Sequence, residues 1–393
     1  MMVKTKKLKI TFLSTWPEVN DGIATFCENL AKHLPEKFSG YKIIWNIARI
    51  NWIRQLKDKD TNKIVFEVNS KNLDDYIKLA KYINTSDTDI VVIQFINNIF
   101  GGFGNYIFEF LKKNQKPVLV VLHSIPMFKT QSKLQLKQKI LKKFKNFDLD
   151  LVVMSNTAKK FLSSKMGFKN NSLHKIYHPA PDFVKLSEIQ KNNFRKKLGF
   201  DQKTKIIFTY GILREDKGIL EILQALQILI QQKYNVKFLL CGKEQDSQGK
   251  YTKKIKALVS DLNLKNHFKF VNEFLEQKRI GEYLQSSDIF LTTQHNLGLH
   301  SSGTLAYALS AGSVIISTPI IHAQEILDGA GIIVPSKNPR ALSVAVKKLL
   351  DDQTFYKRCQ LNSKKIGRNL SWNKLSLKYL QIFWEIVKRS KKI

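Results

Sequence analysis

The sequence has little cysteine, few acidic residues and no long apolar run. Its three cysteines are Cys27, Cys241 and Cys359, and no two of them form a C-x-x-C pair. So small and odd a number fits neither a disulfide framework nor a structural zinc site. The purely apolar runs have the length of strands, whereas a transmembrane helix needs about 20 apolar residues. The basic start, residues 1–9, lacks the apolar segment of a signal peptide, so we expect a cytoplasmic protein.

The shortage of acidic residues leaves a large positive charge. There are 65 lysines and arginines against 32 aspartates and glutamates, which gives a net charge of +33. Such a charge attracts nucleic acid, an anionic membrane surface or phosphorylated substrates. Lysine and asparagine are abundant along the whole chain, so a general compositional bias is the competing explanation. The sequence shows no RNP, zinc-finger or helix-turn-helix signature, so nucleic acid is the partner we least expect.

A strand–helix alternation runs through the chain of 393 residues, of which 43% are apolar. Ile90–Phe95 and Pro117–His123 are almost continuously apolar, as parallel strands buried on both faces are. The pattern breaks around 177–191 and then restarts, which predicts two α/β units with doubly wound parallel sheets. We therefore expect an N-terminal domain over residues 1–185, a second domain over 186–365 and a C-terminal helix within 366–393.

Two glycine loops between a strand and a helix are candidate phosphate sites. In the first, Gly22 and Ile23 begin a helix, where backbone N–H groups can face an anion. Many glycines in this position only make a turn. The second runs from Gly211 to Gly218 and contains Arg214 and Lys217, two cations that suit a diphosphate. The alternative for this loop is a basic helix cap.

Two further candidates follow from strand and helix ends. Ser301, Ser302, Gly303 and Thr304 precede an apolar helix, and a run of small residues at a helix N-terminus suits a closely approaching anion. A simple N-cap needs only one serine. His123 ends a predicted buried strand, and the carboxyl ends of such strands border the ligand site. A histidine there can transfer a proton or bind a sugar hydroxyl, although a single histidine is more often structural.

Residues 127–147 contain seven lysines and no acidic residue. Leu136, Ile140 and Phe144 repeat every four residues, which predicts a basic amphipathic helix. Such a helix binds an anionic membrane surface, or else packs its apolar stripe on the sheet. Two D-x-D matches, 87–89 and 148–150, precede strands and are predicted to be caps and solvated turns rather than metal sites.

These motifs together resemble the family-4-type glycosyltransferases of the GT-B fold, in the group 1 glycosyl transferase superfamily. The resemblance is carried by the following segments in order: Ser14–Pro17 with Asp21–Phe26, Gln94 with Ile99–Gly102, Val120–His123, Ser155–Asn156, His178–Pro179, Tyr210–Leu213 with Lys217–Gly218, Ser301–Leu305, Ala311–Gly312, Ser317–Pro319, Glu325 and Ser371–Trp372. It implies two Rossmann-like domains facing a central cleft, with the C-terminal helix returning to the first domain.

The resemblance also implies an activity, namely transfer of a sugar from a nucleotide-sugar donor to a glycan or lipid-linked acceptor, with retention and without metal or other cofactor. In the positions that match, Gly22 and Ile23 would contact the donor diphosphate, and Lys217 with Arg214 would neutralise it. Gly211 and the segment Ser301–Thr304 would also bind the donor. His123 would contact the transferred sugar, and Glu325 the ribose or sugar hydroxyls.

The chain departs from the family pattern at three donor-site positions. Leu299 and Tyr307 stand where the family has the two carboxylates of Glu-x7-Glu, and Ile212 stands where it has an arginine. These departures favour the alternative of a non-catalytic GT-B scaffold that binds a partner. A different GT-B enzyme, an epimerase or a phosphorylase, is a further alternative.

Overall fold

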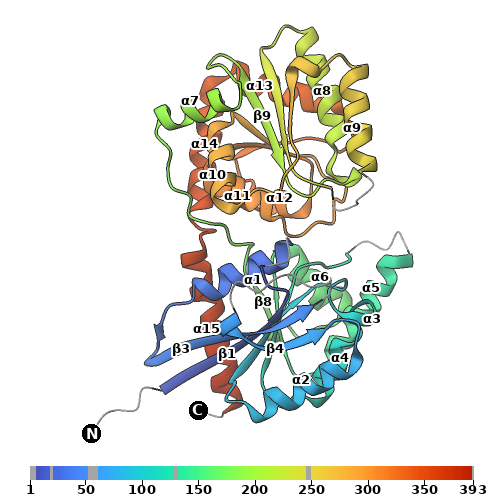
Figure 1. Ribbon diagram of the computed structural model, residues 1–393, viewed down its shortest axis with the longest axis vertical. Helices are drawn as coiled ribbons and strands as arrows, with labels where there is room; N and C mark the ends of the chain where they lie inside the picture. The colour runs from blue at the N-terminus through green and yellow to red at the C-terminus, as the bar shows by residue number, and fades with distance from the viewer. Residues whose placement is uncertain (1–5, 18–20, 52–60, 128–131, 245–248, 392–393) are drawn as a thin grey trace. The chain divides into compact units, whose positions relative to one another are not determined.

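The computed structural model describes residues 6–17, 21–51, 61–127, 132–244 and 249–391. The chain divides into two compact units, and each has its own sheet flanked by helices, parallel throughout its described pairs except for one antiparallel pair in unit 1 (Figure 1). Unit 1 comprises residues 1–177 and 372–393, and unit 2 comprises residues 178–371. From the sequence, we expected the domain boundaries between residues 185 and 186 and between residues 365 and 366.

The described part of unit 1 forms an eight-stranded sheet in the order β2-β3-β1-β5-β6-β7-β8, with β4 paired to β3. Its strands are β1 (Lys6–Ser14), β2 (Lys37–Phe38), β3 (Tyr41–Asn51), β4 (Ile64–Asn69), β5 (Ile90–Phe95), β6 (Val118–Leu122), β7 (Asp150–Val153) and β8 (Leu173–Lys175). Its helices are α1 (Gly22–Lys32), α2 (Leu73–Thr85), α3 (Gly101–Gly104), α4 (Ile107–Lys113), α5 (Ser132–Lys143), α6 (Asn156–Met166) and α15 (Trp372–Ser390). The order reverses direction next to β1, as in doubly wound sheets.

Side chains of the central strands enter two cores, one on each face of this sheet. In β6, Val120 packs into one core, while Leu119 and Val121 pack into the other. All five residues of β6 are buried. A continuous apolar run is therefore the correct sequence signal for these strands, because both faces are covered by helices.

The C-terminal helix α15 belongs to unit 1 and covers one of these two faces. Trp372, Tyr379 and Phe383 are fully buried in the same core as Phe12 of β1. The Phe12 and Phe383 rings meet edge to face at 6.3 Å between centroids. Helix α15 thus completes a core that begins with the first strand of the chain.

Unit 2 has a six-stranded sheet in the order β11-β10-β9-β12-β13-β14, in which every described pair is parallel. Its strands are β9 (Lys205–Tyr210), β10 (Val236–Cys241), β11 (Phe268–Val271), β12 (Ile289–Thr292), β13 (Val314–Ser317) and β14 (Gly331–Ile333). Its helices are α7 (Glu188–Lys197), α8 (Ile219–Gln231), α9 (Lys250–Asp261), α10 (Gln277–Ser286), α11 (Gly303–Ala311), α12 (Ile321–Ile326), α13 (Pro339–Asp351) and α14 (Gln353–Gly367).

Helix α14 has no counterpart among the predicted elements. Its buried residues are Cys359, Ser363 and Gly367, so small residues take the place of an apolar stripe. A Cβ atom at Gly367 would come within 2.3 Å of the Leu309 carbonyl oxygen in α11. The two helices pack too closely for large side chains, and periodicity of large apolar residues therefore gives no signal here.

The prediction of a solvated turn at Asp150 is wrong. Asp150 is only 2% exposed and begins β7. Its carboxylate pairs with the His174 Nε2 atom at 2.7 Å and with the Arg389 guanidinium of α15. A buried carboxylate needs such partners, because burying an unpaired charge costs several kcal/mol. The carboxylate therefore links β7, β8 and α15.

Replacing Phe383 by alanine should lower the free energy of unfolding of unit 1 by about 3–5 kcal/mol, since it leaves a cavity in a closed core. Urea denaturation followed by tryptophan fluorescence reports on this unit, because all five tryptophans lie within its residue ranges. The matched control is Leu377→Ala in the same helix, where the side chain is 46% exposed and a change within about 0.5 kcal/mol is expected. Equal losses in both variants would contradict this account of the core.

Candidate functional site

In unit 1, the candidate glycine loop leads into the N-terminus of α1 after β1. Asp21 caps the helix, with its Oδ1 atom accepting from the Ala24 N–H at 2.6 Å and from the Thr15 hydroxyl at 3.3 Å. Gly22 is exposed, and a Cβ atom placed there would have no neighbour within 4 Å. Ile23 is half-buried. The first turn of α1 therefore presents open backbone at Gly22.

His123 follows β6, next to the end of β5. Its Nε2 atom lies 2.7 Å from the Oε1 atom of buried Gln94, and its backbone N–H donates to the Phe95 carbonyl. The imidazole meets the Phe26 ring of α1 edge to face at 4.7 Å. Strand ends and α1 thus hold the ring in a fixed orientation. His123 and Gly22 both belong to the carboxyl edge of the unit 1 sheet.

In unit 2, the loop after β9 approaches the N-terminus of α11. Gly211 has φ 131°, a conformation that favours glycine, and its Cβ position lies 3.7 Å from the Thr304 side chain. At the other end of the loop, the Thr293 hydroxyl donates to the Lys217 carbonyl at 2.8 Å. The end of β12 and the start of α11 therefore position this loop.

The two cations of the loop differ in their surroundings. Arg214 makes two hydrogen bonds to the Asp216 carboxylate, at 2.9 and 3.0 Å, and is about half exposed. Lys217 is half-buried and pairs with no carboxylate in the described part of the chain. Burial, and secondly the nearby Arg214 charge, lower the pKa of Lys217 to about 8. The Asp216 charge opposes this lowering, but among the described residues Lys217 forms no direct ion pair, in contrast to Arg214.

The N-terminus of α11 carries the predicted small residues. Ser302 caps it, with its hydroxyl accepting from the Leu305 N–H at 3.4 Å and lying 3.1 Å from the Thr304 hydroxyl. The Ser302 N–H donates to the Nδ1 atom of His322 in α12 at 2.9 Å. Gly303 lies against His178, whose ring would be 3.2 Å from an added Cβ atom. The following N–H groups and the helix dipole favour an anion.

Three histidines around this helix end form a cluster that the sequence did not single out. Burial lowers the pKa of His178 and of His300 to about 4, and that of His322 to about 3. His300 is 2% exposed, and neither of its ring nitrogens has a hydrogen-bond partner in the described protein. The imidazoles are neutral at pH 7, so each can accept as well as donate a hydrogen bond.

Glu325 lies in α12, and its charge acts on His300 to oppose the lowering of that pKa. The two family positions without carboxylates are occupied by apolar packing. Tyr307 is 9% exposed, and its ring lies edge to face with His178 and Phe183 at 6.5 and 6.0 Å. Leu299 is half-buried, and its carbonyl accepts from the His322 N–H at 3.1 Å.

The predicted site residues therefore form one group in each unit. Gly211, Arg214, Lys217, Glu325 and the segment 301–304 surround the carboxyl edge of the unit 2 sheet. Gly22, Ile23 and His123 lie at the corresponding edge of unit 1. No group of three or more His, Cys, Asp or Glu side chains in the described residues could hold a metal ion.

The basic segment 127–147 forms α5 and a following turn, although residues 128–131 lie outside the description. Ile140 and Phe144 are buried in the unit 1 core, at 1% and 0% exposure, and only Leu136 of the predicted stripe is exposed, at 44%. Of the two alternatives for this stripe, packing on the sheet is therefore confirmed for two of its three positions. The exposed side of this segment carries lysines. Within the described residues, no helix has the length and apolar character needed to cross a membrane.

Residues 190–366 match the sequence family described as Glycosyl transferases group 1. The chain carries a group 1 glycosyltransferase domain. The resemblance recognised in the sequence is thereby confirmed. An uncharacterised glycosyltransferase of Methanocaldococcus jannaschii is 22% identical over 240 residues, which are 59% of this chain and 59% of that protein. The match thus spans less than two thirds of this relative.

Two solved structures share the fold over nearly the whole chain. A glycosyltransferase from Rickettsia africae has a TM-score of 0.75 at 20% identity, covering 97% of this chain and 99% of its own. Anabaena HepE, solved in complex with UDP and glucose, has a TM-score of 0.75 at 14% identity, covering 96% and 100%. The GT-B fold with two parallel-sheet domains is therefore confirmed for this chain.

The histidine cluster should make unit 2 sensitive to acid. A histidine whose folded pKa lies below its unfolded value of about 6.5 contributes stability that is lost as the pH falls below that value. For His300 the loss is about 1.4 kcal/mol per pH unit between roughly 6.5 and 4. His300→Asn should reduce the pH dependence of unfolding by about one proton, as measured by urea denaturation and circular dichroism from pH 7 to 5. An unchanged slope would show that the ring is protonated or exposed in the folded protein.

Proposed function

We propose that the protein is a glycosyltransferase that moves a sugar from a nucleotide-sugar donor to a glycan or lipid-linked acceptor. The observation that carries this proposal is Lys217, a half-buried cation without a carboxylate partner in a group 1 glycosyltransferase domain. A bound diphosphate would supply the missing negative charge. HepE, which shares the fold, was solved with UDP and glucose, and this supports a nucleotide-sugar donor.

The surrounding groups suit the parts of such a donor. The N–H groups at the start of α11, with the hydroxyls of Ser301, Ser302 and Thr304, would bind the phosphates, and Gly211 would leave room for them. Glu325 and the neutral His300 would bind ribose or sugar hydroxyls, since a carboxylate and an imidazole both accept hydrogen bonds from them. In unit 1, Gly22 and Ile23 would contact the diphosphate and His123 the transferred sugar.

The chemical step requires stabilisation of the departing nucleoside diphosphate. Lys217 would supply this charge, assisted by Arg214 once the anion competes with Asp216. A fixed cation takes the role that a metal ion has in other transferases, so we propose a metal-independent transfer. Retention of the anomeric configuration and a hexose as the transferred sugar are part of the proposal, and both rest on the family resemblance.

The outer face of α5 supports an acceptor at an anionic membrane surface. Lys139, Lys142, Lys143 and Lys145 are exposed there. Basic side chains near an anionic surface contribute about 1 kcal/mol each to binding. We propose peripheral attachment to the cytoplasmic membrane face by charge rather than by insertion, in keeping with a lipid-linked acceptor.

Binding of UDP, GDP, ADP and CMP, measured by thermal shift and then by calorimetry, tests the role of Lys217. One nucleotide should raise the melting temperature, and Lys217→Ala should weaken its binding about 10- to 100-fold, the value of a hydrogen bond to a charged group. Because the pKa of Lys217 is about 8, affinity should fall as the pH rises from 7.5 to 9.5, a range in which the nucleotide phosphates stay ionised. Lys217→Arg, which stays charged, should remove this pH dependence.

Leu299 and Tyr307 favour a second candidate, a GT-B scaffold that binds a nucleotide or a partner without transferring a sugar. The two candidates differ in turnover. Release of UDP, or of the other bound nucleotide, from its sugar conjugate should be measurable for a transferase, even as slow hydrolysis. Binding without any turnover supports the scaffold, and the absence of binding by all four nucleotides would contradict the transferase and favour a scaffold that binds a partner.

Gly22→Leu tests the backbone contact proposed at α1. Since a Cβ atom there meets nothing within 4 Å, the variant should fold with unchanged or slightly higher stability. Its side chain would cover the first turn of α1, so sugar release from the donor should fall at least about tenfold. Gly22→Ala, which adds one methyl group, is the matched control and should lose less. Full activity of the leucine variant would exclude donor contact at this backbone.

A further inference from the structure

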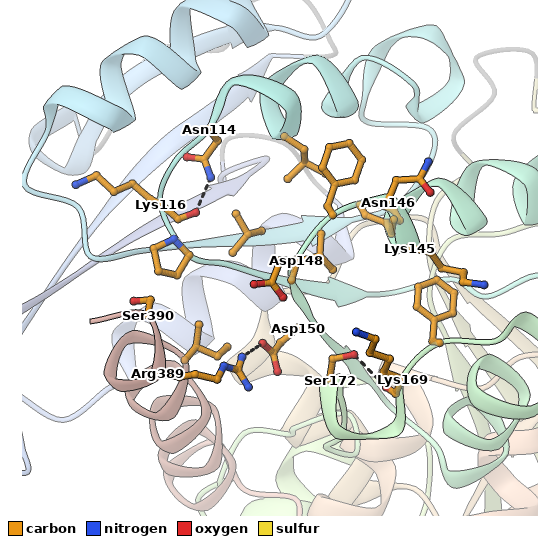
Figure 2. A pocket seen from close by; sticks show the side chains of 18 of the residues that line it. Asn114, Lys116, Lys145, Asn146, Asp148, Asp150, Lys169, Ser172, Arg389 and Ser390 are labelled. Atoms are coloured by element: carbon orange, nitrogen blue, oxygen red, sulfur yellow. Dashed lines mark hydrogen bonds and ion pairs between the residues drawn. The ribbon is translucent and has the colours of Figure 1, made fainter. Parts of the chain in front are cut away.

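A cavity of about 910 Å³ lies in unit 1, away from the candidate site (Figure 2). It is bordered by Val118 and Asp150, the first residues of β6 and β7, and by the end of α15. His123, by contrast, follows the last residue of β6. The cavity is therefore at the amino edge of the sheet, opposite to the edge that carries the site residues of this unit.

The cavity wall carries more positive than negative side chains. Its cations are Lys116, Lys145, Lys169 and Arg389, and its carboxylates are Asp148 and Asp150. Asp150 is already paired with His174 and Arg389. The three lysines pair with no carboxylate of the described chain, and only Asp148 is left to oppose them. Figure 2 shows Lys116 on one side of the cavity and Lys145 with Lys169 on the other.

Neutral polar groups and aromatic rings complete the wall. The Asn114 side chain donates from Nδ2 to the Lys116 carbonyl at 2.6 Å, while its buried Oδ1 atom has no partner in the described protein. The hydroxyls of Ser172 and Ser390 donate to backbone carbonyls, at 3.0 and 2.9 Å, and keep their lone pairs for a ligand. Phe147 and Phe168 add apolar surface.

We propose that this cavity is a second binding site, for an acidic saccharide. Amide and hydroxyl groups match sugar hydroxyls, phenylalanine rings match the apolar faces of sugar rings, and the unpaired lysines match a carboxylate or a phosphate on the sugar. The volume is within the range of about 300–1,000 Å³ that small-molecule sites have. This site is separate from the proposed donor site and does not depend on sugar transfer. It would give the protein affinity for an acidic glycan in addition to its donor.

Calorimetry on the whole protein in low salt tests this assignment with three probes. These are a hyaluronan tetrasaccharide for carboxylates, glucose 6-phosphate for phosphate and maltotetraose as a neutral saccharide. At least one acidic probe should bind, and maltotetraose should bind at least tenfold more weakly. The acidic probe that binds better identifies the anionic group. Absence of binding by both acidic probes at millimolar concentration, or equal binding of maltotetraose, would overturn the proposal.

Two variants separate the cavity from the general positive charge. Lys145→Ala with Lys169→Ala should weaken binding at least tenfold, whereas the matched pair Lys78→Ala with Lys81→Ala removes the same charge from exposed positions on α2 and should not. Ser172→Trp keeps the charge and fills the cavity, so it should also abolish binding. Equal weakening by both lysine pairs would show non-specific attraction and overturn the proposal. Lys217→Ala should leave this binding intact, so the outcome is independent of the donor site.

Discussion

Burial of each sheet on both faces is the constraint on which the rest of the molecule depends. The helices that connect parallel strands cover both faces of the sheet, and parallel strands place all their carboxyl ends on one edge. The loops that follow β9, β12 and β13 therefore meet at one edge of unit 2. Hydrogen bonds across these loops, such as those from Thr293 to the Lys217 carbonyl and from the Ser302 N–H to His322, fix their mutual positions. The site is a consequence of the sheet order.

Desolvation determines the charge of this edge. The same burial that lowers the pKa of Lys217 to about 8 keeps the three histidines neutral. Within the described part of the chain, Lys217 forms no ion pair with a carboxylate, whereas Arg214 is paired with Asp216. A site with one unpaired cation attracts one anionic group of a ligand to that cation. The neutral imidazoles around the start of α11 can donate and accept hydrogen bonds without carrying a full charge.

The sequence was sufficient to predict a strand or helix wherever the pattern of neighbouring residues determines it. β5 lies at its predicted residues, Ile90–Phe95, and β6 (Val118–Leu122) lies within the predicted strand Pro117–His123. His123 was placed at a strand end from the apolar run alone. Contacts between residues far apart in the sequence could not be predicted. Nothing in the sequence indicates that Asp150 pairs with Arg389, 239 positions away. Nor does it indicate that His178, His300 and His322 lie close together. Helix α14 was missed because close packing selects small residues there, which periodicity of large residues does not detect. The cavity of unit 1 combines three separate loops with α15 and has no signature in any one segment.

The missing carboxylates are best understood from the packing of Tyr307. Its ring lies in an aromatic group with His178 and Phe183, and burial raises its pKa well above the ordinary value. A glutamate at this position would place a carboxylate in a pocket formed by a neutral imidazole and a phenyl ring, without a cation to pair it. The cost of burying such a charge exceeds what one hydrogen bond returns. A single Tyr307→Glu replacement is therefore expected to be unfavourable among the present neighbours, His178 and Phe183. The groups in place around the starts of α11 and α12 that can bind hydroxyl groups are instead Glu325, which lies in α12, and the buried imidazole of His300, whose two ring nitrogens have no hydrogen-bond partner in the described protein.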